Sequence, residues 1–193
     1  MSGRDWAEVL EFWFGGPASP ELGRNRKCWF EKSADFDALV RDRFLETYEH
    51  AAAGRLDAWR ARPLAALALV VTLDQFPRNM FRGSPRAFAA DPLALAVAQE
   101  TVASGFDRVL LPVQRVFVYL PFEHAEDVAA QRTALGLFER LAGDPTTAGT
   151  LGWAMRHYAV VARFGRFPHR NAILGRESTP DELAFLARPG ASF

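Results

Sequence analysis

Hydrophobic residues recur at helical spacing along almost the whole chain. In the first segment they fall at steps of three and four residues, at Trp6, Val9, Leu10 and Trp13. This spacing predicts a short helix that ends at the Gly-Gly-Pro run of residues 15–17. Residues 35–53 show the same periodicity and are closed by Gly54, which predicts a longer amphipathic helix.

The next segment, PLAALALVVTLDQ from Pro63 onward, is apolar around almost its full circumference. Pro63 suits the first turn of a helix, and a helix that is apolar on all sides belongs in the centre of a fold. We expect Phe76-Pro77 to break this helix and to place the following Arg, Asn and Gly residues on a loop.

The remaining segments also favour helices. They are expected from the N-cap Asp91 to Ala103, from Pro112 to just before Pro121, over 122–141, over 150–164 and after the capping box at Thr179. Only the segment after Pro112 has enough β-branched residues to suit a strand, and it has no partner strand. The prediction is an all-α single domain, residues 1–193, built as an array of about eight or nine helices with a tetratricopeptide-like rhythm of paired helices.

Composition narrows the class of protein. With 193 residues, 49% of them hydrophobic, the chain supports one well-covered core. Basic and acidic residues number 23 each, so no net field attracts nucleic acid or an anionic membrane, and neither is expected as a partner. A single cysteine, Cys28, suits a reducing compartment, and no apolar run reaches the length of a membrane span. We therefore expect a cytoplasmic protein.

Two similar motifs carry the most distinctive chemistry. Phe76-Pro77-Arg78-Asn79 and Phe167-Pro168-His169-Arg170-Asn171 each follow an apolar helical segment; they are called the first and second FP motifs. Fixed cations and amides at a helix end suit a phosphate or a carboxylate. The predicted ligand-binding residues from these motifs and their flanks are Arg78, Asn79, Arg82, Arg166, His169, Arg170 and Asn171.

Further polar residues are predicted to point inward. At 100° per residue, His124, Asp127 and Gln131 share the apolar face of the helix expected over 122–141, whereas Glu126 falls on its outer side. His157 lies on the apolar side of its helix, and Asp74 shares a side with the central leucine and valine residues. Asp74, Gln131 and His157 thus join the ligand-binding set, and His124 with Asp127 are the candidate catalytic acid or base.

The motifs also resemble those of a known group of proteins. The runs VLEFWFG, LDQFPRNMFRGSPRAFAADPLAL, VFVYLPFEHAEDVAAQ and HYAVVARFGRFPHRNAILGRESTPDELAFL are similar to an uncharacterised bacterial family, a domain of unknown function with a tetratricopeptide-like all-helical fold. The DQFPRN and FGRFPHRN motifs are its most specific marks. The resemblance implies the fold, one domain and a cytoplasmic setting, and it supplies no activity or catalytic residues.

Three functions compete at this point. The first is a cleft that binds a small anionic metabolite, and transforms it if the candidate acid or base acts on it. The second is a protein-binding scaffold, by analogy with tetratricopeptide-like folds. The third is a metal site using His124, His157 and His169 with Glu123 or Asp127, but no metal-binding spacing is present and the surrounding arginines oppose a cation. No P-loop or Rossmann glycine pattern occurs, so we predict no cofactor and no metal, and the sequence leaves open whether the protein is an enzyme.

Overall fold

A computed structural model describes residues 5–191, which form helices joined by short turns, and this range contains no β-strand. The all-α prediction is confirmed. The α-helices are α1 (Trp6–Phe14), α2 (Ala34–Ala52), α3 (Pro63–Val70), α4 (Phe76–Met80), α5 (Asp91–Ala103), α6 (Pro112–His124), α7 (Val128–Glu139), α8 (Thr150–Phe164) and α9 (Pro180–Leu186). Short helical turns lie between them at η1 (Lys27–Trp29), η2 (Asp57–Ala61), η3 (Val71–Gln75), η4 (Pro85–Ala87), η5 (Phe106–Val109), η6 (Pro145–Thr147) and η7 (Pro168–Arg170). Within the described range, no helix is both long and apolar enough to cross a membrane.

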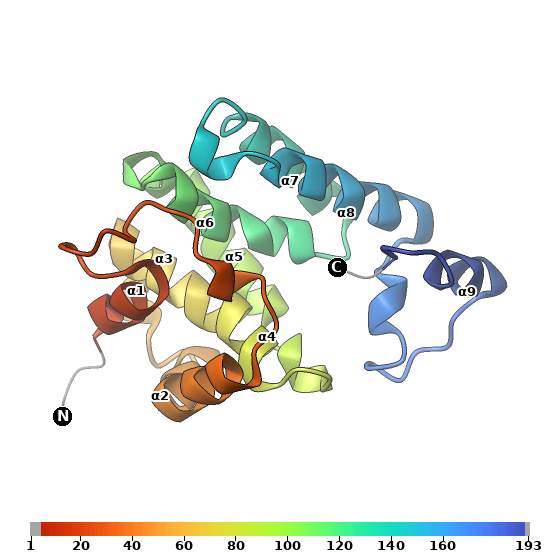
Figure 1. Cartoon of the computed structure of the whole chain (residues 1–193), viewed down its shortest axis with the longest axis horizontal. Helices are drawn as coiled ribbons and strands as arrows, with labels where there is room; N and C mark the ends of the chain where they lie inside the picture. Colours follow the sequence, from red (N-terminus) through yellow and green to blue (C-terminus); the bar gives the residue numbers. More distant parts are fainter. Residues whose placement is uncertain (1–4, 192–193) are drawn as a thin grey trace.

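Helix α3 lies at the centre of the helical body, as its apolar circumference predicts. Residues 65–70 are all buried, and α3 packs against α1, α5 and α6 (Figure 1). Later helices continue the stack, because α6 contacts α7 and α7 contacts α8. Burial on every side leaves no room for polar groups on residues 65–70, and Asp74 is the first charged residue after this apolar stretch.

An aromatic cluster joins the N-terminal helices to this centre. The Trp13 ring meets Phe76 and Phe117 edge to face at 5.6 and 5.7 Å between ring centroids, and Phe44 lies 4.7 Å from Phe76. Such pairs stabilise by packing geometry as well as by buried area. Phe76 therefore anchors the first FP motif in the core.

The first FP motif does not break its helix, contrary to the prediction. Helix α3 passes through a π-helical turn, η3, and continues as α4, so Arg78 and Asn79 lie on a helix. In the π turn the N–H of Phe76 donates to the carbonyl of Val71, five residues back. The wider turn changes the register just before Pro77, which has no N–H to donate, and the helix passes the proline without a break.

A second proline was also misjudged as an end point. Helix α6 continues through Pro121 to His124, so the segment from Pro112 is neither a strand nor a helix that stops at residue 120. Almost every residue of its second half is buried, and this packing offsets the hydrogen bond that the proline removes. The helix predicted over 122–141 is divided, because a turn at 125–127 separates α6 from α7.

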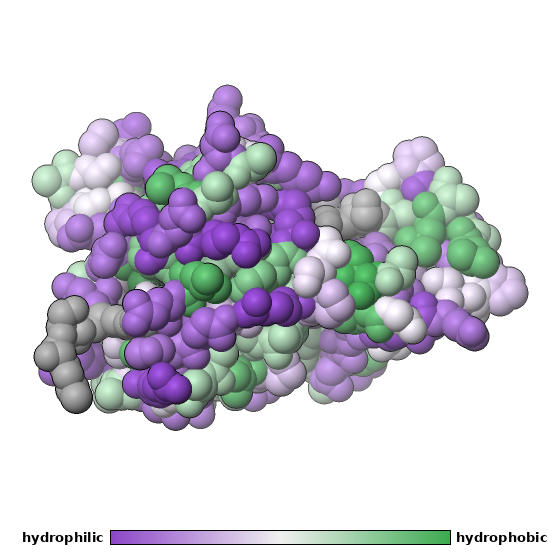
Figure 2. Space-filling model, turned by 90° about the horizontal axis from the view of Figure 1, so that it is seen from below, coloured by the Kyte–Doolittle hydropathy of each residue, from purple (hydrophilic) through white to green (hydrophobic). Residues whose placement is uncertain are grey.

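The chain reverses after α8 and forms a C-terminal segment, residues 165–191. Gly165 adopts the left-handed conformation, with φ of 71°, that commonly ends a helix. Phe167 packs with Val160 and Val161 in a small core of its own, which Phe185 of α9 covers. Figure 1 shows this segment at one end of the molecule. In Figure 2, hydrophilic residues cover much of the visible face. An apolar area lies at the end of the molecule formed by the C-terminal segment.

Candidate functional site

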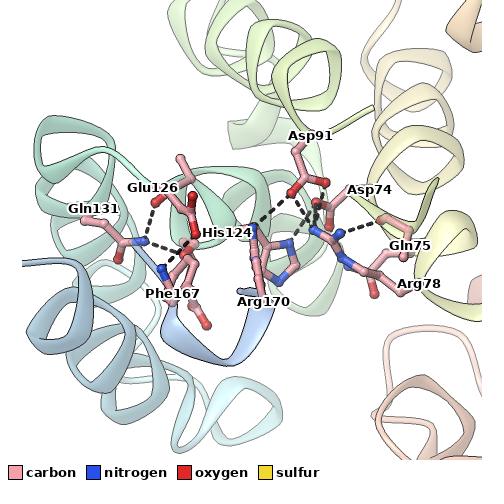
Figure 3. A network of polar contacts seen from close by, with 12 residues as sticks. Asp74, Gln75, Arg78, Asp91, His124, Glu126, Gln131, Phe167 and Arg170 are labelled. Atoms are coloured by element: carbon pink, nitrogen blue, oxygen red, sulfur yellow. Dashed lines mark hydrogen bonds and ion pairs between the residues drawn. The ribbon is translucent and has the colours of Figure 1, made fainter. Parts of the chain in front are cut away.

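The two FP motifs meet at one carboxylate. Arg78 of α4 places its Nη2 atom 2.8 and 2.9 Å from the two oxygens of Asp91, and donates to Oδ2 (Figure 3). Arg170, at the end of η7, donates from Nη1 to the same Oδ2 atom at 3.3 Å. Asp91 is the first residue of α5, so that helix begins at the residue predicted to be its N-cap, and the carboxylate binds arginines instead of capping.

A buried carboxylate and a histidine form a pair beside these arginines. Asp74 lies on the π turn, is completely buried and receives a hydrogen bond of 2.8 Å at Oδ1 from Nδ1 of His124, the last residue of α6. Gln75 donates to the other Asp74 oxygen at 2.6 Å, and Arg78 lies 3.8 Å away. Burial raises the pKa of Asp74, but the charge and hydrogen bond of His124 and the charge of Arg78 outweigh it and lower that pKa.

The hydrogen bond to Asp74 determines which ring nitrogen of His124 can accept a proton. Because Nδ1 of His124 donates to Asp74, its Nε2 atom carries the lone pair in the neutral ring. No polar group of residues 5–191 is hydrogen-bonded to Nε2, and the side chain is 17% exposed. The Asp74–His124 pair thus presents a proton acceptor to an accessible position.

Arg170 is the most confined cation of the site. Its guanidinium lies against the rings of Phe88 and Phe167, at 4.7 and 4.5 Å from their centroids, and its side chain is only 8% exposed. Burial first, and repulsion from Arg78 second, lower the pKa of Arg170 to about 10, although Asp91 acts in the opposite direction. Phe88 also lies under the guanidinium of Arg78 at 4.7 Å, so one ring orients both arginines.

The other half of the cluster is built around Glu123, His157 and Gln131. Buried Glu123 lies 2.9 Å from Nδ1 of His157, whose ring centroid is 6.4 Å from that of His124. Gln131 donates to the carbonyls of Glu123 and Ala125 at 2.5 and 2.9 Å and so fixes the end of α6. The inward orientations predicted for His157 and Gln131 are confirmed by their burial, and the partly buried His124 ring contacts the buried Asp74 carboxylate.

His169 lies beside this half of the cluster. Its ring centroid is 5.5 Å from that of Phe167. Burial, then the charges of Arg170 and His157, lower the pKa of His169 to about 4, so its ring is neutral near pH 7.

Glu126 has a role that helical phasing did not reveal. Its carboxylate accepts from both terminal nitrogens of Arg176 at 2.5 and 2.8 Å and from the backbone N–H of Phe167 at 2.7 Å. The prediction that Glu126 lies on an outer helix face is wrong, because the residue sits in the turn between α6 and α7. It attaches the second FP motif to the helical body (Figure 3).

Asp127 also differs from its prediction. It is exposed, and its side chain accepts from the N–H of Ala130 at 2.7 Å as the N-cap of α7. The inward orientation that made Asp127 a partner for His124 is therefore wrong, since the turn at 125–127 shifts the phase of the helix. The partner of His124 is Asp74.

Four predicted ligand-binding residues lie in two other ion-pair groups. Arg82 binds both oxygens of Asp37 on α2 at 2.7 and 2.8 Å, and Asn79 donates to the same carboxylate at 2.7 Å. Arg166 binds both oxygens of Glu182 on α9 at 2.7 and 2.8 Å, and Asn171 donates to it at 3.3 Å. The site therefore brings together Asp74, Arg78, His124 and Arg170 of the predicted set, with Asp91 and Phe88 as additions.

The surroundings of the cluster give no sign of a metal centre. Among residues 5–191, no three His, Cys, Asp or Glu side chains are grouped so that they could hold an ion. A surface hollow of about 510 Å³ is lined by Pro20, Glu21 and residues 24–28, none of which belongs to the cluster.

The fold and this cluster define an all-helical protein with a charged, partly buried site where two motifs distant in sequence meet. The chain belongs to a family of bacterial proteins of unknown function, DUF924, whose model matches residues 9–190. It is similar to the solved structure of a protein of unknown function from Agrobacterium tumefaciens, with 44% identity, a TM-score of 0.83 and coverage of 94% of this chain and 96% of that one. Curated proteins give no match. The predicted family is thus confirmed, while the tetratricopeptide-like pairing of helices stays a prediction.

Proposed function

We propose that the protein binds a small anionic metabolite at Arg78 and Arg170, beside the Asp74–His124 pair. The observation that carries the proposal is the incomplete hydrogen bonding of Arg170. A guanidinium has five N–H donors, yet this one makes a single hydrogen bond within residues 5–191, at 3.3 Å to Asp91. Its Nε atom is buried without an acceptor. Buried polar groups are almost always paired, so the unused donors support a missing acceptor.

The geometry around Arg170 favours an anion as that acceptor. The rings of Phe88 and Phe167 both lie against the guanidinium, and aromatic rings provide no oxygen to accept from the N–H groups at its edge. Asp91 serves two arginines at once, and the oxygens of Asp74 are held by His124 and Gln75. Neither carboxylate accepts a hydrogen bond from Nε of Arg170, and a bound carboxylate or phosphate would supply that acceptor.

His124 adds chemistry to the binding site. With Nδ1 fixed by Asp74, its Nε2 atom is placed to accept a proton from a bound ligand or, once protonated, to donate one. Proton transfer at Nε2 is the catalytic role that we propose for His124. The cytoplasmic location favoured by the composition is part of the same proposal. Arg82 and Arg166 are already held in two-oxygen pairs with carboxylates, so the proposed anion site does not use them.

A thermal-shift screen of phosphorylated and dicarboxylic metabolites tests the proposal. A ligand at about ten times its Kd stabilises a folded chain by about 1.4 kcal/mol, or about 3–5 °C at this length. We expect a stabilising anion whose effect is lost in Arg170→Lys and in Arg78→Lys, since a lysine keeps the charge without the planar fork.

Arg82→Ala and Arg166→Ala are matched controls, because each removes an arginine from the same motif or its flank and leaves the Asp91 cluster intact. They should retain the shift. A screen without any stabilising anion, or a shift that survives in both lysine variants, would overturn the proposal.

A protein-binding scaffold is the alternative. It is favoured by the exposed side chains of Trp153 and Met155 on α8 and of Leu183 on α9. A stoichiometric protein partner that is lost in Trp153→Ala and retained in Arg170→Lys would support the scaffold over the anion site.

A further inference from the structure

We infer that the anion is a tetrahedral dianion of the phosphoryl or sulfate type, and that His124 is its third contact, taking up a proton as the anion binds. The inference rests on the proposed function and extends it to the class of ligand. It starts from the three side chains that converge beside Asp74 and Asp91, one each from α4, α6 and η7: Arg78, His124 and Arg170 (Figure 3).

Three donors from separate elements fit a phosphoryl group better than a planar carboxylate. One guanidinium binds both oxygens of a carboxylate in a planar fork, as Arg82 does with Asp37. A phosphoryl group instead has three terminal oxygens in a pyramid, so it can engage three donors that come from separate elements. Arg78 and Arg170 supply two such donors, and His124 supplies the third only when Nε2 is protonated.

The charge count of the cluster gives the reason for a proton to accompany the anion. Arg78 on α4 and Arg170 on η7 are balanced by Asp74 on η3 and Asp91 on α5. In the other half, Glu126 is balanced by Arg176, and Glu123 pairs with His157 of α8; His169 is neutral near pH 7. The cluster therefore has no net positive charge to offset a dianion while His124 is neutral. An imidazolium at His124 adds one, and the Asp74 carboxylate at 2.8 Å stabilises it.

Sulfate is the appropriate probe, because it remains a dianion across neutral pH and any proton taken up must go to the protein. Calorimetric titration of sulfate at pH 7.5, in buffers of different ionisation enthalpy, measures the protons taken up per anion. We expect an uptake between about 0.5 and 1 for the full chain, and an affinity for sulfate that falls as the pH rises.

Two variants identify the group that takes up the proton. His124→Gln should still bind sulfate through the two arginines, more weakly and with no proton uptake. His50→Gln, which changes the histidine outside the cluster, should behave as the unchanged protein. Acetate, a planar monoanion, should bind at least tenfold more weakly than sulfate.

The two proposals fail in different ways. Sulfate binding without proton uptake, uptake that persists in His124→Gln, or acetate binding as tight as sulfate binding would overturn this inference and leave the anion site standing. If sulfate and every metabolite in the screen fail to bind, the proposed function itself is overturned.

Discussion

Arg78 and Arg170 share one oxygen atom: Oδ2 of Asp91 accepts from the first at 2.9 Å and from the second at 3.3 Å. Two guanidinium groups that converge on one carboxylate repel each other, and the shared acceptor is what holds them together. The following predictions test how this contact supports the fold and the site.

Replacing the shared carboxylate should destabilise the fold. Asp91→Asn leaves two close cations with a neutral acceptor, so we expect the free energy of unfolding to fall by about 2–3 kcal/mol in urea titrations. Sulfate should restore more stability to this variant than to the unchanged protein. Asp37→Asn is the matched control, since Asp37 is equally exposed and also binds an arginine, but Arg82 is far more accessible, and a loss of about 1 kcal/mol is expected.

Phe88 should matter more for anion binding than for stability. Phe88→Leu removes the ring that lies under both arginines, which frees their orientation and should weaken sulfate binding by about fivefold to thirtyfold, the effect of about 1–2 kcal/mol. Trp153→Leu removes a comparable stack with Arg156 at an exposed position outside the cluster and should not change the sulfate affinity. Equal losses in both variants would contradict a specific role for Phe88.

Glu126 should control the docking of the C-terminal segment. Glu126→Gln weakens the pair with Arg176 and the contact to the Phe167 N–H, at a local cost of about 2 kcal/mol. Hydrogen exchange should then accelerate at the amides of 166–176 and remain unchanged in α3 and α6. Glu177→Gln, at an exposed position nearby, is the control, and uniform acceleration along the chain would show that Glu126 supports the whole fold.

His169 should make stability depend on pH between about 6.5 and 4. The folded state holds this histidine neutral with a pKa of about 4, whereas the unfolded chain protonates it near 6.5. The unfolded state therefore binds more protons in this window, and stability is lost as the pH falls. Partial exposure limits the effect to about 1–2 kcal/mol. His169→Gln should flatten the urea midpoint over this range, and an unchanged slope would be evidence against the buried neutral histidine.

Asp127 should behave as a helix cap. Asp127→Ala removes the acceptor for the Ala130 N–H and should cost about 1 kcal/mol, whereas Asp127→Ser should retain most of that stability. Neither variant should alter sulfate affinity or proton uptake. A change in proton uptake would return Asp127 to the catalytic role predicted from helical phasing.

The sequence allowed the prediction of most helices because their apolar periodicity is strong and local. Helices α8 and α9 begin where predicted, since Thr150 follows a glycine and Thr179 forms a capping box. Both prolines misled the prediction in the same way, because Pro77 and Pro121 were expected to end helices and instead lie within helices whose tertiary packing outweighs one missing hydrogen bond. The single-domain boundary over 1–193 stays a prediction.

The candidate site was predicted only in part, for a geometric reason. Asp74, His124 and His157 were found from helical faces, which local sequence determines. Asp91 was recognised only as a helix start, and Glu126 was assigned to the wrong face because the turn at 125–127 resets the phase. Which arginines converge depends on contacts between distant elements, so Arg78 and Arg170 could not be distinguished from Arg82 and Arg166 before the structure.

The position of the C-terminal segment in the chain determines when the cluster can form during synthesis. Asp74, Arg78, Asp91 and His124 all precede it in the chain, while Arg170 comes with the small core around Phe167. During synthesis, α1 to α7 therefore leave the ribosome while the second guanidinium is still inside it. The proposed anion site is therefore completed only after the segment around Phe167 has been synthesised and has folded.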